Sequence, residues 1–287
     1  MSIVTTQPLP PWQIRNSTFV WGQRTYVMGV LNVTPDSFSD GGQFNTLTTA
    51  LTQARKLITA GTDLLDIGGQ STRPQAEEIS LDEELNRVMP ILQAIRQESN
   101  IPISIDTTRA SVAASAIAAG ADVINDISGG SFDPDMLPTV AKLGVPVILM
   151  HMRGTPKTMQ QLTDYQNLIS EITDFLQHQI AAAIACGVNP ARIAIDPGVG
   201  FAKTYEQNLE ILRRLAEFRQ LNCPMLVGVS RKSFIGHILH QPDPQQRVWG
   251  TAAACSAAIV GGADILRVHD VPEMRDVCQV TDAIWRR

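Results

Sequence analysis

The sequence has little cysteine and no long hydrophobic run. Its four cysteines lie far apart: Cys186, Cys223, Cys255 and Cys278. Without a C-x-x-C pair, neither a disulfide framework nor a thiolate zinc site is predicted. No stretch offers the roughly 20 strongly apolar residues that a membrane-spanning helix needs, and residues 1–11 contain no basic segment followed by an apolar one. We therefore expect a soluble cytoplasmic protein with no membrane partner.

Positive charge is also in short supply. The chain has 23 Lys and Arg residues against 28 Asp and Glu residues, a formal net charge of -5, which argues against a general nucleic-acid-binding or anionic membrane surface. Its 20 glycines and 17 prolines follow no short period, which excludes a collagen-like chain. An anionic ligand must therefore be held by a local cluster of cations.

What the chain does have is apolar material in a regular order. Of its 287 residues 44% are hydrophobic, enough for a large buried core. Short apolar runs alternate with longer stretches of helical composition, as expected of repeated βα units. Eight strands are predicted, at residues 26–34, 63–69, 102–107, 123–128, 146–152, 193–201, 224–231 and 263–270. Predicted helices include residues 46–60, 81–97, 109–119, 165–186, 206–219 and 247–259.

Two α/β architectures fit this order, a closed (β/α)8 barrel and a doubly wound open sheet. Nearly every predicted strand ends in polar side chains: Asn32, Asp66, Asp106, Asn125, His151, Asp196, Ser230 with Arg231, and Arg267 with His269. A barrel gathers all of its carboxyl strand ends around one pocket, whereas an open sheet spreads them along a crest. The sequence therefore predicts a TIM barrel.

One domain over residues 1–287 is predicted, with residues 1–25 as an N-terminal extension. Trp12, Phe19 and Trp21 lie in residues 11–25, a segment long enough for a short hairpin. We expect this hairpin to plug the closed end of the barrel.

Three polar residues at strand ends carry most of the functional prediction: Asp106, Asn125 and Asp196. Grouping them in one pocket is costly unless a ligand supplies matching donors or positive charge. A planar ring with an amidine-like N–H and NH2 edge would satisfy a carboxylate through two parallel hydrogen bonds, and the amide can bind the adjoining donor and acceptor.

Cations are expected on the other side of this pocket. Lys232 follows the seventh strand, and Arg267 and His269 are two residues apart on the eighth, so both point to the same face. This region of a barrel is a frequent phosphate site. Two other interpretations of Lys232 stay open, a Schiff-base lysine of an aldolase and an ion-pair partner for a carboxylate.

The first two loops after strands also have binding composition. Asn32 begins the loop 32–42, and its amide oxygen can complete the shell of an Mg2+ ion held mainly by phosphate oxygens and water. The loop 68–74 combines paired glycines, two hydroxyls and Arg73, a composition that favours anion binding.

Taken together, these motifs resemble the dihydropteroate synthase family. The resemblance lies in residues 28–42 (MGVLNVTPDSFSDGG) and 66–74 (DIGGQSTRP), and continues through 104–107, 124–126, 150–156, 196–201, 228–233 and 267–269. It implies a (β/α)8 barrel, usually a homodimer, that joins 6-hydroxymethyl-7,8-dihydropterin diphosphate to 4-aminobenzoate in folate synthesis. Diphosphate is the second product.

The resemblance also implies roles for individual residues. Mg2+ is expected on Asn32, and the pterin among Asp106, Asn125, Asp196 and Lys232. Diphosphate is expected on Thr72, Arg267 and His269, with Arg73 and Asp40 brought in by loop closure, and Val268 is expected to contact substrate. The 4-aminobenzoate is expected in a frame of Phe38, Pro74, Phe201 and Ser230. Three residues depart from the family pattern: Gln70 replaces a common glutamate, and Gln75 and Ala202 replace common glycines. The first puts a hydrogen bond of the second loop in question, and the other two indicate altered loop flexibility.

A mechanism follows from these roles as a hypothesis. Mg2+, Arg267 and His269 would stabilise the departing diphosphate, while Asp106 and Asp196 would stabilise the cationic pterin methylene left behind. The competing functions are a pterin-binding methyltransferase domain, a pterin-binding protein without catalytic activity, and the aldolase mentioned above.

Overall fold

A parallel sheet forms the centre of the computed structural model, which describes residues 9–33, 43–73 and 76–286. Within these residues eight strands pair in the order β8-β7-β6-β5-β4-β3-β10-β9. Their bounds are β3 Tyr26–Asn32, β4 Leu64–Gly68, β5 Ile103–Asp106, β6 Val123–Asp126, β7 Val147–Met150, β8 Ile193–Asp196, β9 Leu226–Val227 and β10 Ile265–Val268. A parallel bridge between Ile195 and Met225 joins β8 to the start of β9. The sheet thus closes, and the predicted barrel is confirmed over the open sheet.

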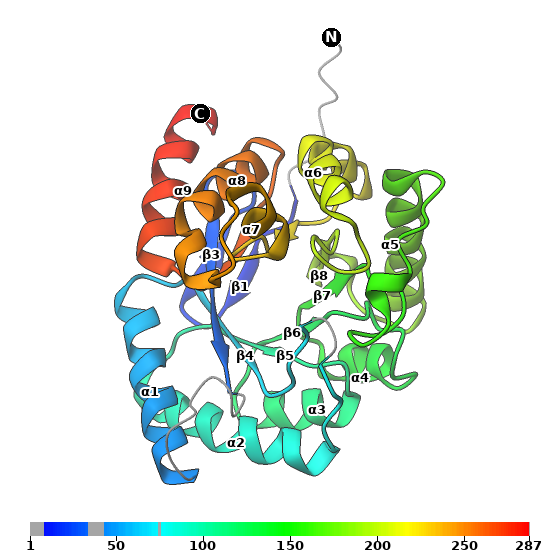
Figure 1. Ribbon diagram of the computed structural model, residues 1–287. Coiled ribbons are helices and arrows are strands. Elements are labelled where there is room, and N and C mark those ends of the chain that lie inside the picture. The colour runs from blue at the N-terminus through cyan, green and yellow to red at the C-terminus, as the bar shows by residue number, and fades with distance from the viewer. Residues whose placement is uncertain (1–8, 34–42, 74–75, 287) are drawn as a thin grey trace.

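Helices cover the outside of this barrel (Figure 1). Their bounds are α1 Gln43–Thr59, α2 Leu81–Glu98, α3 Ala110–Ala118, α4 Met136–Leu143, α5 Leu168–Ala185, α6 Tyr205–Arg213, α7 Ser233–Leu239, α8 Val248–Val260 and α9 Val271–Trp285. The helix predicted over 206–219 is wrong in its second half, where a 3-10 helix, Leu215–Leu221, follows α6. The short helices α4 and α7 were not predicted, because one or two turns give little periodicity.

The N-terminal hairpin closes one end of the barrel. Strands β1 (Trp12–Ile14) and β2 (Ser17–Phe19) pair antiparallel. The rings of Trp12 and Trp21 meet edge to face at 5.0 Å, and both pack with Met28 and other residues at the N-terminal half of the barrel interior. The indole N–H of Trp12 donates to the carbonyl of Ala191 at 2.8 Å. The predicted plug is therefore confirmed.

At the opposite end, several strands stop earlier than predicted. β8 ends at Asp196, since Pro197 follows and Gly198 has φ +71°. β9 ends at Val227 rather than at Arg231. As a result, residues 197–203 and 228–232 are loops over the carboxyl ends of the strands, where they can contribute to a pocket.

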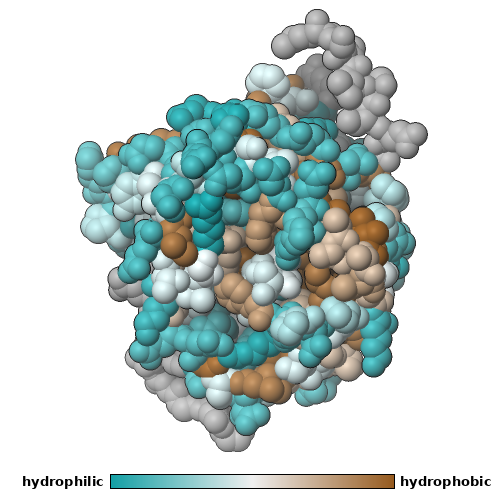
Figure 2. Space-filling view, turned by 90° about the vertical axis from the view of Figure 1, so that its right-hand side faces the viewer, coloured by the Kyte–Doolittle hydropathy of each residue, from teal (hydrophilic) through white to brown (hydrophobic). Residues whose placement is uncertain are grey.

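None of the described helices is both long and apolar enough to span a bilayer. Figure 2 shows the side on which α5 lies, and this side is largely hydrophilic with apolar side chains in between.

Candidate active site

The polar strand ends meet at the open end of the barrel. Asp106 pairs in register with Gly68 of β4 and with Asn125 of β6, and Asp196 pairs with Met150 of β7. Their side chains are 4 to 6% exposed. Parallel strands in register therefore bring together the three residues that the sequence singled out.

Arg267 lies among the carboxylates and not across the pocket from them. Its Nε donates to Asp66 at 2.7 Å and its Nη2 donates to Asp106 at 2.8 Å. The expectation that the cations face the carboxylates from the other side is wrong for Arg267. The reason is its length and position: β10 pairs with β3, which pairs with β4 and through it with β5, and the long side chain reaches the carboxylates on β4 and β5.

Asp66 lies beneath this arrangement, and the sequence motifs did not predict a role for it in the site. It is fully buried, and besides Arg267 it accepts from Ser104 Oγ at 2.5 Å and from Asn125 Nδ2 at 3.3 Å. Asp66 thus fixes both the guanidinium and the amide. Its place two residues before the strand end, on the inward face of an apolar strand, was the signal that could have identified it.

Burial controls the protonation of Asp106. The pKa of Asp106 is raised to about 7, chiefly because the carboxyl is removed from water. The positive charge of Arg267 opposes this rise, and the negative charge of Asp66 adds to it. Among the described residues, only its Oδ2 accepts a hydrogen bond. The other oxygen is left for a ligand donor, and a positive charge nearby would favour the ionised form.

Asp196 and Lys232 form a second charged group. Burial raises the pKa of Asp196, while the amide of Gly198, at 2.7 Å from Oδ1, and the charge of Lys232 lower it. Burial also lowers the pKa of Lys232 to about 8, with Asp196 acting in the opposite direction.

Lys232 makes its own contacts with the loop after β8. Its Nζ donates to the carbonyl of Val199 and lies 4.5 Å from the ring centroid of Phe201. No carboxylate of the described residues lies within ion-pairing distance of Lys232, so the simple ion pair is not formed there. The amine instead lies over an aromatic ring at the edge of the pocket, in cation–π geometry.

His269 is held by Ser230. The Ser230 hydroxyl accepts from the His269 backbone N–H at 3.1 Å and lies 3.0 Å from Nδ1, to which it can donate. Burial lowers the pKa of His269 to about 3, and the charges of Arg267, Arg231 and Arg73 contribute. This shift favours the neutral imidazole, which offers an N–H donor to a ligand.

The neighbours of these residues point elsewhere. Arg231, which has φ +60°, pairs with Asp270 through two nitrogens. Val268 alternates with Arg267 and packs in the core between the barrel and the helices. Only its backbone atoms remain for the predicted ligand contact.

The second loop is held by Gln70. Its amide nitrogen donates to the carbonyls of Ser71 at 2.9 Å and Glu77 at 2.8 Å, and its oxygen accepts from Ile79 N at 2.9 Å. The hydrogen bonding that the departure from glutamate put in question is thus present, and two of the three bonds require the amide. Thr72 is half-buried and Arg73 exposed on this loop.

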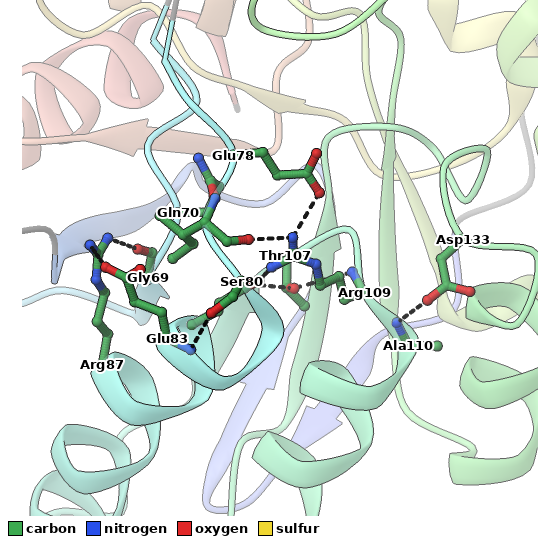
Figure 3. Close-up of polar contacts among 12 residues, drawn as sticks. Gly69, Gln70, Glu78, Ser80, Glu83, Arg87, Thr107, Arg109, Ala110 and Asp133 are labelled. Carbon is green, nitrogen blue, oxygen red and sulfur yellow. Dashed lines mark hydrogen bonds and ion pairs between the residues drawn. The ribbon is translucent and has the colours of Figure 1, made fainter.

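A network of hydrogen bonds and ion pairs supports the same side of the pocket (Figure 3). Arg109 donates to Glu84 at 2.7 Å, Glu78 at 2.7 Å and the carbonyl of Ile79 at 2.6 Å, and Thr107 Oγ1 donates to Glu84 at 2.6 Å. A cavity of about 180 Å3 lies beside it. Its lining includes Thr72, Asp106 and Lys157.

Three predicted site residues lie outside the described residues, namely Phe38, Asp40 and Pro74, as does Gln75. Asn32 is the last residue of β3 and is half-buried. Ala202 is buried with φ +52°, the left-handed region in which glycine is at ease.

Comparison with known proteins agrees with this geometry. The family model described as pterin binding enzyme matches residues 28–269. A dihydropteroate synthase of Synechocystis sp. is 59% identical over 277 residues, which are 96% of this chain and 96% of that protein.

Solved structures match over similar lengths. One is a dihydropteroate synthase of Clostridium difficile in the presence of pteroic acid, with 45% identity, a TM-score of 0.89 and coverage of 93% of this chain and 99% of that one. Another is the Xanthomonas albilineans enzyme with 4-aminobenzoic acid, with 40% identity, a TM-score of 0.90 and coverage of 96% and 98%.

Proposed function

The chain belongs to the dihydropteroate synthase family of pterin-binding enzymes, and we propose that its pocket at the open end of the barrel carries out that reaction. The chain is a transferase of folate biosynthesis. In the reaction, the dihydropterin-methyl group of 6-hydroxymethyl-7,8-dihydropterin diphosphate passes to the amine of 4-aminobenzoate, and diphosphate leaves. The observation that carries this assignment is the contact of Arg267 with Asp106, since it puts an anion-binding group beside a carboxylate suited to the pterin.

The pterin is proposed to bind between Asp106, Asn125 and Asp196. Asn125 has its amide nitrogen engaged by Asp66, so its oxygen can accept from a ring N–H. Asp106 has one oxygen free of described donors, and Asp196 accepts from Gly198 through Oδ1. Carboxylate and amide acceptors at fixed positions match the N–H and NH2 edge of a pterin.

The diphosphate is proposed to bind on the β10 side. Arg267 uses Nε and one Nη2 proton for the carboxylates, and a guanidinium has five N–H donors in all, so donors remain for phosphate oxygens. The neutral His269 adds a hydrogen bond, and the second loop supplies Thr72 and Arg73. Donors fixed before the reaction stabilise the negative charge that develops on the leaving oxygen.

The C–O bond is proposed to break before the amine attacks. The electron pair of that bond leaves with diphosphate, and the pterin methylene becomes cationic. Asp106 and, behind it, Asp196 stabilise this cation by charge. The nitrogen of 4-aminobenzoate then forms the new C–N bond and loses a proton to solvent, so no strong general base is required.

Mg2+ is proposed to accompany the diphosphate. The described residues contain no group of three or more His, Cys, Asp or Glu side chains able to hold a metal, which fits an ion bound chiefly through substrate oxygens and water. Asn32 would add one amide oxygen at the end of β3. When bound, the ion neutralises charge on the leaving group.

The 4-aminobenzoate is proposed to lie over the loop after β8. Phe201 and Ser230 are the described members of its predicted frame, and Phe38 and Pro74 are the others. The ring of Phe201 is partly exposed beside Lys232, so it offers an apolar face next to a positive charge for an aromatic carboxylate.

A homodimer is also proposed. The adjacent helices α8 and α9 expose large apolar side chains: Trp249, Val260, Val280, Ile284 and Trp285. Exposed apolar clusters of this kind mark interaction surfaces. Light scattering should give the mass of a dimer, and Trp249→Glu with Val280→Glu should give that of a monomer; a monomeric native chain contradicts the proposal.

The compartment is proposed to be the cytoplasm. All four cysteines lie in the described residues and are free thiols. This state fits a reducing compartment.

The reaction is tested with the native chain, Mg2+ and the dihydropterin diphosphate, with and without 4-aminobenzoate. Diphosphate release should require 4-aminobenzoate and equal the dihydropteroate formed. Tight pterin binding without release would contradict the proposal and indicate a methyltransferase domain or a protein that only binds pterin. Borohydride trapping of Lys232 with a carbonyl substrate should give no adduct. An adduct would indicate an aldolase instead.

A further inference from the structure

Lys203 is a buried lysine that the proposed mechanism does not use. It is 2% exposed at the end of the loop 197–203. Burial lowers its pKa well below the ordinary value, although the charge of Asp196 opposes this. Since a buried amine is costly unless its hydrogen bonds are made, its partners indicate its role.

Lys203 links its own loop to β7. Its Nζ donates to the carbonyl of Phe201 at 2.8 Å and lies 3.0 Å from His151 Nδ1. Burial lowers the pKa of His151 to about 2, with Lys203 contributing, so the imidazole is neutral and its Nδ1 can accept from the amine. The His151 backbone N–H in turn donates to the carbonyl of Asp196 at 3.0 Å.

The loop that Lys203 holds carries the contacts of Lys232. The carbonyl of Val199 accepts from Lys232 Nζ, and the ring of Phe201 lies under the same amine. Lys203 itself does not face the pocket: it acts on the backbone of Phe201, two residues before it. Movement of the Phe201 backbone would therefore displace its ring, while Lys232 keeps its bond to the Val199 carbonyl.

The loop has little room to adjust. A Cβ on Gly198 would come within 1.9 Å of the His151 carbonyl oxygen, so the two backbones are already in close contact. Ala202 takes φ +52°, and the Tyr165 hydroxyl donates to its carbonyl at 3.0 Å. Two side chains, Lys203 and Tyr165, therefore hold consecutive carbonyls of one tight loop.

We propose that Lys203 is a positioning residue for 4-aminobenzoate: it holds the Phe201 backbone so that the Phe201 ring meets this substrate. The proposal rests on the proposed function, because the role of Phe201 belongs to it. The proposed pterin-binding residues Asp106, Asn125 and Asp196 lie at the strand ends, outside the loop 197–203, and Asp106 keeps its contact with Arg267.

The test compares Lys203→Met, which keeps the length of the side chain and removes its donors, with the native chain. We expect the KM for 4-aminobenzoate to rise about tenfold, the effect of roughly one lost hydrogen bond, while kcat and the Kd for the dihydropterin diphosphate stay within a factor of about two. The control is Lys142→Met, an exposed lysine of α4, which should change none of these values.

A purely structural role would give a different result, because a smaller folded fraction lowers the apparent kcat and leaves KM unchanged. That outcome, or an unchanged KM, overturns the proposal. In a Phe201→Leu background, Lys203→Met should raise KM much less, since both changes act on one contact.

Tyr165→Phe is the second variant, and it decides the matter if Lys203→Met does not fold. It removes one hydroxyl and keeps the ring over which Arg153 lies. We expect a smaller rise in the same KM, and an unchanged KM counts against loop positioning. Failure of the proposed function itself is recognised separately, because the native chain would then form no dihydropteroate.

Discussion

Asp106→Asn separates binding of the pterin from stabilisation of a cation. The substitution keeps the size of the side chain and one acceptor oxygen but removes the charge. Arg267 keeps its hydrogen bond to Asp66 at 2.7 Å, so the guanidinium stays anchored. The variant therefore tests the charge of Asp106 with little other change to the pocket.

The two effects differ in size. A carboxylate roughly 4 Å from a cation contributes about 4 kcal/mol at an effective dielectric constant of about 20, which corresponds to about a thousandfold loss of kcat. Replacing a charged acceptor by a neutral one weakens a hydrogen bond by about 1 kcal/mol, or about fivefold in the Kd of the pterin substrate.

The assay measures kcat as diphosphate release with saturating 4-aminobenzoate, and Kd by calorimetry without it. Both are measured at a pH between the pKa values of Asp106 and Lys232, so that each residue is mainly charged. Asp264→Asn is the control, since Asp264 is a buried carboxylate at the closed end, bonded to the Met225 N–H at 3.0 Å. Equal losses in kcat and Kd for Asp106→Asn would refute the reasoning, because Asp106 would then act only in binding.

Three further predictions concern pH, metal and stability. The kcat/KM for the pterin substrate should rise as the pH increases through about 7, where Asp106 loses its proton, and should fall through about 8, where Lys232 loses its proton. A rise near pH 7 that persists in Asp106→Asn contradicts this assignment. Asn32→Ala should raise the Mg2+ concentration needed for half-maximal rate several-fold with kcat recovered at high Mg2+, and an unchanged Mg2+ titration excludes Asn32 as a ligand. Asp66→Asn should lower the free energy of unfolding in urea by about 2 kcal/mol, as expected for a weakened hydrogen bond to a charged group, whereas unchanged stability would mean that its contact with Arg267 contributes nothing.

The barrel could be predicted from the sequence because its strands are continuous apolar runs that end in polar residues. Asp106, Asn125 and Asp196 were found in this way, since parallel strands in register bring their ends to one level. The hairpin was predictable from its aromatic residues. The lengths of β8 and β9 were not, because apolar loop residues such as Val199 and Val229 are buried over the strand ends and resemble strand residues.

The contacts made by long side chains and the pKa shifts caused by burial could not be predicted from the sequence. Arg267 reaches two carboxylates on other strands, which depends on the order of β10, β3, β4 and β5 in the sheet. The lowered pKa of His269 follows from its burial near arginines of three segments. The link between Lys203 and His151 joins residues that are 52 positions apart, and neither lies in a motif that predicts the contact.

The central claim is that the pocket stabilises a cationic pterin methylene as diphosphate leaves. The most direct test is the secondary isotope effect on kcat/KM with deuterium at that methylene, measured at low pterin substrate. We predict a clearly normal effect, because the carbon becomes planar as the C–O bond breaks. An effect near unity would show that the amine attacks while diphosphate is still bonded, and would contradict the role given to Asp106.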